Sequence, residues 1–168
     1  MTPEFRPRVV LATLARHDVD FVVIGGMAGV AQGSALPTYD LDVAYARDRG
    51  NLERLVAALR ELQATLRGAP PEVPFVLDAK TLENGSHFTF DTPYGPFDIL
   101  SDPVGAPRYE LLKKAAVDTE IEGTRVLVAS LDHLIGMKKA TGRSKDEYMA
   151  MEYRTLADEI ARRRRSVS

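Results

Sequence analysis

The chain has 168 residues, which is enough for a single domain with a substantial buried core. Its 22 lysines and arginines against 24 acidic residues give a formal charge of −2, which argues against a generally basic coat for binding polyanions. The chain has no cysteine, so disulfides, thiolate zinc sites and cysteine nucleophiles are excluded. It also has only three histidines, which argues against a histidine-rich metal site, so we expect oxygen atoms to supply the ligands of any metal. Because it lacks a long apolar run and a signal-peptide core, we expect a cytoplasmic protein that does not cross a membrane.

The N-terminal part of the chain predicts two helices and two strands. Residues 3–17 carry a rough apolar stripe that indicates a helix. Phe21–Ile24 is a continuous run of β-branched and aromatic residues, which is typical of a strand buried on both faces. A short helix is expected over residues 27–32, and the alternating segment Tyr39–Tyr45 predicts a half-buried strand.

The rest of the chain predicts helices interrupted by two hairpins. Leucines at spacings of three and four indicate a helix over residues 51–67. The other expected elements are a loop at residues 69–74, a hairpin with strands at 86–91 and 95–100, a helix at 107–116, a second hairpin at 118–129, and helices at 130–140 and about 144–162. Ser130 is a plausible N-cap, and Ser144 to Glu147 has the spacing of a capping box.

This order of elements predicts an α/β (α+β) fold with one mixed β-sheet flanked by helices. We expect a single domain over residues 1–168, with a core of about 18–129 and a short C-terminal helical segment of about 130–165. Four consecutive arginines, Arg162 to Arg165, end the predicted last helix and leave the rest of the chain with a formal charge of −6.

A pair of glycines, Gly25-Gly26, follows the first predicted strand. Paired glycines allow a ligand to approach the backbone closely, and a helix that begins there could receive a phosphate. A tight turn between strand and helix explains the same residues without a ligand. The dinucleotide-binding and P-loop glycine patterns are absent.

Three aspartates lie on predicted strands. Asp40 and Asp42 are two residues apart, so their side chains share one face of a strand. Asp98 interrupts the otherwise apolar Phe97–Leu100 segment, and a neighbouring strand would bring it to the same place. Three carboxylates could hold Mg²⁺ for phosphoryl transfer, with Asp98 as a ligand or as a base. Exposed strand faces are the alternative explanation.

A late group of charged residues joins two predicted helices. Lys138 follows an apolar helix face, and Arg143 and Asp146 stand around the start of the last helix. Cations beside a triphosphate would neutralise its charge. Solvated surface positions, with Asp146 favoured by the helix dipole, are the alternative explanation.

The motifs together resemble the DNA polymerase β-like nucleotidyltransferase superfamily and, more narrowly, its AbiEii/MenT-type branch of toxins from toxin–antitoxin and phage-defence systems. The resemblance spans about residues 20–158. It rests on Val23–Ala28 with Gly33, Thr38–Asp42, Leu134–Ala140 and Arg143–Asp146. Two departures stand out: residues 34–39 contain no lysine or arginine where family members generally have a basic residue, and Gly26 stands where many have serine.

The resemblance implies roles for individual residues. Gly25 and Gly26 would hold a nucleoside triphosphate (NTP), Asp40 and Asp42 would bind Mg²⁺, and Asp98 would assist the attacking group. Lys138 would contact phosphate, Asp146 would anchor the late helices at the site, and Arg143 resembles a motif arginine with a less defined role.

The resemblance also implies an activity and partners. The chain would transfer a nucleoside monophosphate from an NTP, ATP among them, to a hydroxyl of tRNA or of a protein, as a toxin with a cognate antitoxin. The arginines at 162–165 could contact tRNA phosphates or form a solvated tail. A small-molecule acceptor such as an antibiotic, and a non-catalytic nucleotide- or partner-binding module, remain alternatives.

Overall fold

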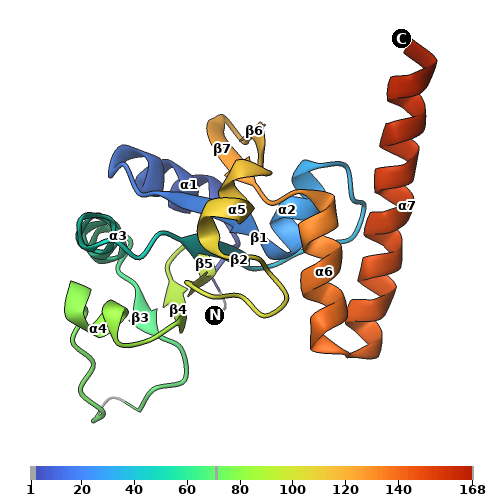
Figure 1. The fold of residues 1–168 in the computed structure, drawn as a ribbon. Coiled ribbons are helices and arrows are strands. Elements are labelled where there is room, and N and C mark those ends of the chain that lie inside the picture. The colour runs from blue at the N-terminus through green and yellow to red at the C-terminus, as the bar shows by residue number, and fades with distance from the viewer. Residues whose placement is uncertain (1–2, 71, 168) are drawn as a thin grey trace.

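A computed structural model of the chain describes residues 3–70 and 72–167. Within these residues the chain forms a seven-stranded mixed sheet of order β3-β4-β5-β2-β1-β7-β6. The strands are β1 (Phe21–Ile24), β2 (Leu41–Tyr45), β3 (Thr65–Leu66), β4 (His87–Thr92), β5 (Gly95–Leu100), β6 (Val117–Ile121) and β7 (Thr124–Val128). The predicted mixed sheet with flanking helices is confirmed, and so is the C-terminal helical segment (Figure 1).

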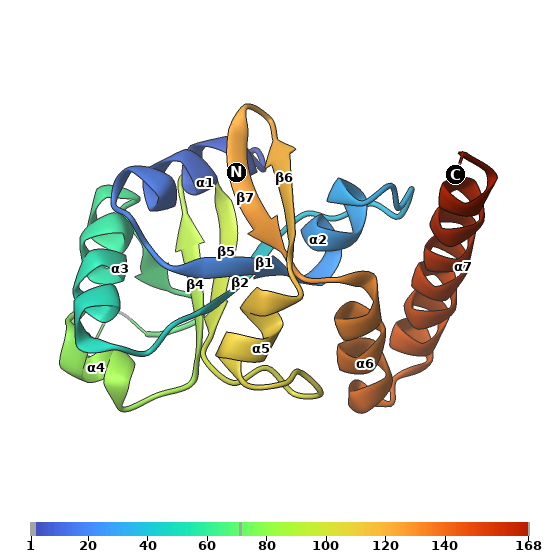
Figure 2. The same cartoon turned by 45° about the horizontal axis from the view of Figure 1, so that its top comes forward.

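Helices surround the sheet. They are α1 (Pro7–Arg16), α2 (Gly25–Ala31), α3 (Arg49–Glu61), α4 (Ala79–Glu83), α5 (Tyr109–Lys114), α6 (Leu131–Thr141) and α7 (Ser144–Val167). In two views, α6 and α7 lie side by side at one end of the molecule, and α3 and α4 lie at the other (Figures 1 and 2). None of the described helices is both long and apolar enough to span a bilayer.

The two faces of the central strands differ in polarity because side chains alternate along a strand. Leu41 and Val43 of β2 and Phe97 and Ile99 of β5 are fully buried in the core, together with leucines of α1 and α3. The alternate positions on the other face carry aspartates at the same level of the sheet. All four residues of β1 are buried, as predicted.

The helices α6 and α7 form a separate hairpin. Ser130 caps α6 as predicted, because its hydroxyl accepts a hydrogen bond from the His133 N–H. The face of α7 that packs inward repeats every three to four residues and comprises Asp146, Met149, Ala150, Tyr153, Leu156, Ala157 and Ile160. A Cβ placed on Gly29 of α2 would lie 2.6 Å from the Tyr153 ring, so the glycine lets α7 dock directly on α2.

Several predicted helix boundaries are wrong. The first helix begins at Pro7 instead of residue 3, because the Arg6 N–H donates to the Tyr94 carbonyl oxygen and holds the preceding segment against the turn between β4 and β5. The helix expected to end at residue 67 ends at Glu61, where Gln63 adopts a left-handed conformation with φ of 55°. The chain then continues into β3, which the sequence analysis missed together with α4.

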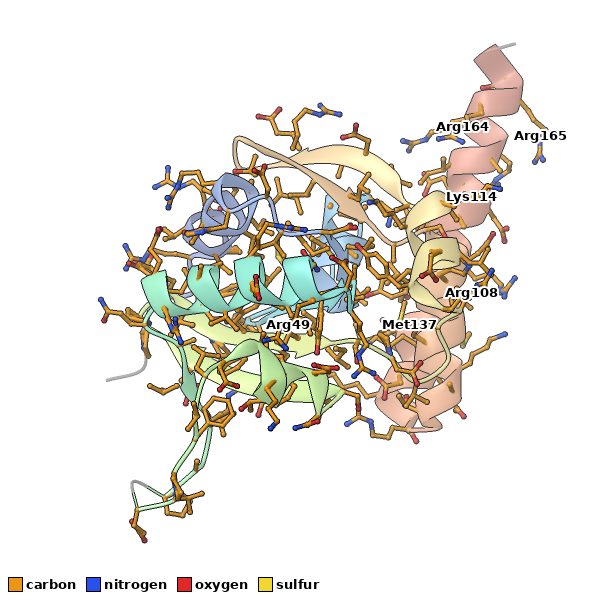
Figure 3. The ribbon with its side chains drawn as sticks, turned by 60° about the vertical axis from the view of Figure 1, so that its left-hand side comes forward. Arg49, Arg108, Lys114, Met137, Arg164 and Arg165 are labelled. Atoms are coloured by element: carbon orange, nitrogen blue, oxygen red, sulfur yellow. The ribbon has the colours of Figure 1, made fainter. Side chains whose placement is uncertain are left out.

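The boundaries of α2 and α7 also differ from those predicted. The helix α2 begins at Gly25, so it includes both glycines that were expected to form the preceding turn. Ser144 is the first residue of α7 and not a cap ahead of it, and the helix extends to Val167 beyond the predicted end near residue 162. The last turns of α7 therefore carry the arginine run, with Arg164 and Arg165 at the far end of the helix (Figure 3).

Candidate active site

The register of three adjacent strands aligns the candidate site. Strand β1 runs antiparallel to β2 and pairs Ile24 with Asp42. Strand β2 runs parallel to β5 and pairs Asp42 with Asp98. Gly25 follows Ile24 directly, so glycine and two aspartates from distant parts of the chain meet at one level of the sheet.

Asp40, Asp42 and Asp98, the carboxylate triad, form the centre of this site. Each offers a carboxylate oxygen, and these three oxygens all lie within 4.8 Å of one another. All three residues are partly buried. Hard divalent cations such as Mg²⁺ prefer carboxylate oxygens, so the donor set fits the metal that the sequence suggested. Asp98 does not lie on an edge strand, since β5 stands between β4 and β2.

The crowding of the triad changes its acidity. Burial, and to a lesser extent the charges of Asp40 and Asp98, together raise the pKa of Asp42 to about 7. Burial also raises the pKa of Asp98, although the Arg67 guanidinium opposes that change. A bound cation would relieve both the desolvation and the repulsion, so the electrostatics of the triad favour a site that is completed by positive charge.

Gly25 and Gly26 lie so close to neighbouring side chains that a Cβ at either position would clash. Gly25 has φ of 68°, and a Cβ at this position would lie 2.3 Å from Asp42 Oδ2. A Cβ on Gly26 would lie 2.7 Å from Thr38 Oγ1. The Thr38 hydroxyl in turn donates to the Asp40 carbonyl oxygen at 3.3 Å. The glycine pair therefore packs against the segment that carries the aspartates and leaves no room for a larger residue.

Arg67 is a site residue that the sequence analysis did not find. Its Nη2 donates to Asp98 Oδ1 at 2.9 Å and to the Phe90 carbonyl oxygen at 2.7 Å, and its Nε donates to Asp91 Oδ1 at 3.1 Å. Its backbone N–H donates to the Thr89 carbonyl oxygen, and Thr89 pairs with Asp98. Arg67 therefore lies two strands away from β5 at the level of Asp98.

Lys138, Arg143 and Asp146 meet at the corner between α6 and α7. Asp146 is buried, and it accepts hydrogen bonds from the Thr141 hydroxyl at 2.6 Å and from Arg143 Nε at 2.6 Å. Lys138 Nζ lies 3.5 Å from Asp146 Oδ1. The charge of Lys138 lowers the pKa of Asp42, so the ammonium acts electrostatically on the triad. Asp146 binds Lys138 and is not one of the clustered carboxylates; Arg143 is largely exposed.

The structure also has a cavity that is not lined by the triad, the glycine pair or Lys138. It has a volume of about 560 Å³ and is lined by residues that include Asp20, Tyr109 and Lys113. Tyr109 Oη donates to Asp20 Oδ1 at 2.6 Å, and Lys113 Nζ donates to the same oxygen at 2.9 Å. Asp20 precedes β1 and Gly25 follows it, so the cavity lies toward the opposite end of that strand from the glycine pair.

No protein-family model and no curated protein matches the sequence. Solved structures do match. The lincosamide antibiotic adenylyltransferase LnuA, solved with lincomycin bound, has a TM-score of 0.61 at 13% identity, over 89% of this chain and 95% of LnuA. ANT(2″)-Ia in complex with adenylyl-2″-tobramycin has a TM-score of 0.57 at 15% identity, over 94% of this chain and 89% of that chain. TM1012 of Thermotoga maritima, described as a nucleotidyltransferase, has a TM-score of 0.55 at 17% identity, over 94% of this chain and 97% of that chain.

The chain has the nucleotidyltransferase fold. The structural similarity spans nearly the whole chain, so the fold includes α6 and α7 as well as the sheet. At 13–17% identity these neighbours show the fold alone, and they give no support to the narrower toxin branch. At this level of identity the roles of individual residues must be argued from the geometry of this chain.

Proposed function

We propose that the chain is a metal-dependent nucleotidyltransferase that uses an NTP and a hydroxyl acceptor. The observation that carries this proposal is the carboxylate triad, set beside Gly25 in a nucleotidyltransferase fold. The acceptor oxygen would form a bond to the α-phosphorus while the bond from that phosphorus to the pyrophosphate oxygen breaks. Pyrophosphate leaves, and the hydroxyl proton passes to a base or to water.

Asp40, Asp42 and Asp98 would hold Mg²⁺, which would neutralise the phosphates and bring reactants together when bound. The fit rests on the donor atoms and on the cost of ionising them together, since burial and then the charges of Asp40 and Asp98 raise the pKa of Asp42 to about 7. A nucleotide brings more negative charge to the same place, so the metal and the NTP are expected to bind together.

The residues around the triad would position the triphosphate. Gly25 and Gly26 let the start of α2 pack directly against Asp42 and Thr38, which would bring its backbone next to a phosphate held at the triad. Lys138 of α6 is partly exposed and its charge acts on Asp42, so its ammonium could leave Asp146 and bind a phosphate oxygen. Asp146 would then act as the anchor that holds Lys138 ready.

The class of acceptor has two candidates, each with its own support. The motif block Leu134–Ala140 with Arg143–Asp146 supports a toxin that modifies tRNA or a protein and is neutralised by an antitoxin. The structural likeness to LnuA and ANT(2″)-Ia supports a small-molecule acceptor such as a lincosamide or an aminoglycoside. Growth arrest on expression would favour the first, and antibiotic resistance would favour the second.

Binding and transfer can be tested separately. Calorimetry with ATP, CTP, GTP and UTP should show binding that depends on Mg²⁺, and the Asp42→Asn variant should lose the metal-dependent part. The rival possibility is a non-catalytic module that binds a nucleotide or partner without turnover. Metal-independent binding without pyrophosphate release would favour that module and count against the enzyme.

A further inference from the structure

The guanidinium of Arg67 is held in place by groups that are not part of the triad. It donates to the Phe90 carbonyl oxygen at 2.7 Å and to the Asp91 carboxylate at 3.1 Å, and these contacts fix its position beside Asp98. The arginine side chain is 34% exposed, whereas that of Asp98 is only 14% exposed. A planar guanidinium with fixed donors can therefore orient the Asp98 carboxylate more firmly than a mobile ammonium could.

One oxygen of Asp98 is already engaged by this contact. Arg67 Nη2 lies 2.9 Å from Asp98 Oδ1. A carboxylate has two oxygens and several lone pairs, so Asp98 can keep this hydrogen bond and still offer electron pairs to a cation. The positive charge of Arg67 repels that cation, and its influence reaches Asp42 as well, whose pKa it lowers.

We propose that Arg67 is a positioning residue that acts as a built-in counter-ion of Asp98. It holds the carboxylate in one orientation and weakens the binding of a divalent cation in the absence of nucleotide. This inference rests on the proposed metal site. Residues 34–39 contain no basic side chain, and Arg67 supplies positive charge to the triad from the β4 side of β5.

Arg67 also forms an ion pair with Asp91, and substitutions of these two residues should change the Mn²⁺ affinity in opposite directions. Removing the charge in Arg67→Gln should tighten Mn²⁺ binding about tenfold, since the arginine cation no longer repels the metal. Removing the competing acceptor in Asp91→Asn should weaken Mn²⁺ binding several-fold, since the arginine charge then acts on the triad without compensation. Arg67→Lys keeps the charge but loses the fixed guanidinium donors, so its Mn²⁺ affinity should lie closer to that of the wild type than that of Arg67→Gln does.

Calorimetric titration of the full chain with MnCl₂ at pH 8, without nucleotide, tests these effects. The matched control is Arg49→Gln on α3, whose guanidinium contacts Glu53 and Glu83 and none of the triad. Its Mn²⁺ affinity should equal that of the wild type. Circular dichroism and the melting temperature show whether each variant is folded, and Asp91→Asn and Arg67→Lys still test the proposal if Arg67→Gln does not fold.

The outcomes separate this inference from the proposed function. Tighter binding by Arg67→Gln together with weaker binding by Asp91→Asn supports the counter-ion role. Unchanged or weaker binding by a folded Arg67→Gln overturns it, because a purely structural arginine would not restrain the metal. If the wild type does not bind Mn²⁺, or if Asp42→Asn binds it equally well, the metal site itself is wrong and the inference falls with it.

Discussion

Asp42 on β2 pairs directly with Asp98 on β5 in parallel register, which places two carboxylates side by side on one face of the sheet. Asp40 brings a third carboxylate to the same point. Such an arrangement is unfavourable without a cation, because burial and mutual repulsion both oppose ionisation. The folded chain tolerates this cost where Gly25 lets the start of α2 pack directly against the Asp42 carboxylate.

The first prediction concerns the stability of the metal-free protein. Asp42→Asn removes one of three repelling carboxylates, so it should raise the free energy of unfolding at pH 8 by up to about 4 kcal/mol. Urea denaturation with EDTA present measures this effect. A variant that is less stable than the wild type at pH 8 would show that Asp42 is not under electrostatic strain.

The second prediction concerns pH. The pKa of Asp42 is about 7 in the folded chain and lies near 4 in an unfolded one, so the folded state binds more protons between these values. The contribution of Asp42 to the free energy of unfolding should therefore fall as the pH rises from about 4 to about 7. The difference between wild type and Asp42→Asn isolates the contribution of Asp42 and of its coupling to Asp40 and Asp98, because titrating groups outside the triad cancel. Mg²⁺ should stabilise the wild type more at pH 8 than at pH 6, and equal stabilisation at both would contradict the assignment.

The third prediction concerns the glycine beside the triad. Gly25→Ala would place a Cβ 2.3 Å from Asp42 Oδ2 and should abolish Mn²⁺ binding by displacing that carboxylate. Gly142→Ala is the matched control, because Gly142 has nearly the same φ of 67° and open space around it. Both variants should lose about 1–2 kcal/mol of stability from the left-handed backbone. Loss of Mn²⁺ binding in both would mean that backbone strain alone is responsible.

The fourth prediction concerns how α7 is attached. Tyr153 is buried against Gly29, and its hydroxyl has no hydrogen-bond partner among the described residues. Tyr153→Phe should therefore be as stable as the wild type or more stable. Tyr153→Ala should lose about 3–5 kcal/mol and loosen α7, so that trypsin cleaves near Arg143 and Lys145 much faster. Unchanged proteolysis of Tyr153→Ala would show that α7 is held by other contacts.

The triad could be predicted because its signals are local. The spacing of Asp40 and Asp42 predicts neighbouring carboxylates, and these do lie together, although β2 begins at Leu41 and Asp40 precedes the strand that was predicted from Tyr39. Asp98 is conspicuous in an apolar strand. The sheet was also predictable in type, since buried and alternating strands have distinct patterns. The pairing of Asp42 with Asp98 could not be read from either segment, because it depends on the order of strands that are far apart in the sequence.

Arg67 could not be predicted for a physical reason. Leu62 and Leu66 continue the leucine spacing of α3, so the pattern extends the helix across residues that the structure places in a turn and in β3. The helix stops because Gln63 turns the chain and β3 finds its hydrogen-bond partners on β4, which lies later in the sequence. The contact between the Arg67 guanidinium and Asp98 therefore depends on the assembled order of β3, β4 and β5.

The most direct measurement follows the phosphorus atom that is transferred. The chain is incubated with Mg²⁺ and NTPs labelled with ³²P at either the α or the γ position, and with total tRNA, cell protein, a lincosamide or an aminoglycoside as acceptor. A nucleotidyltransferase transfers label only from the α position, releases pyrophosphate, and loses both activities in Asp42→Asn. Transfer of label from the γ position, or transfer from the α position that survives in Asp42→Asn, would contradict the proposed chemistry at the triad.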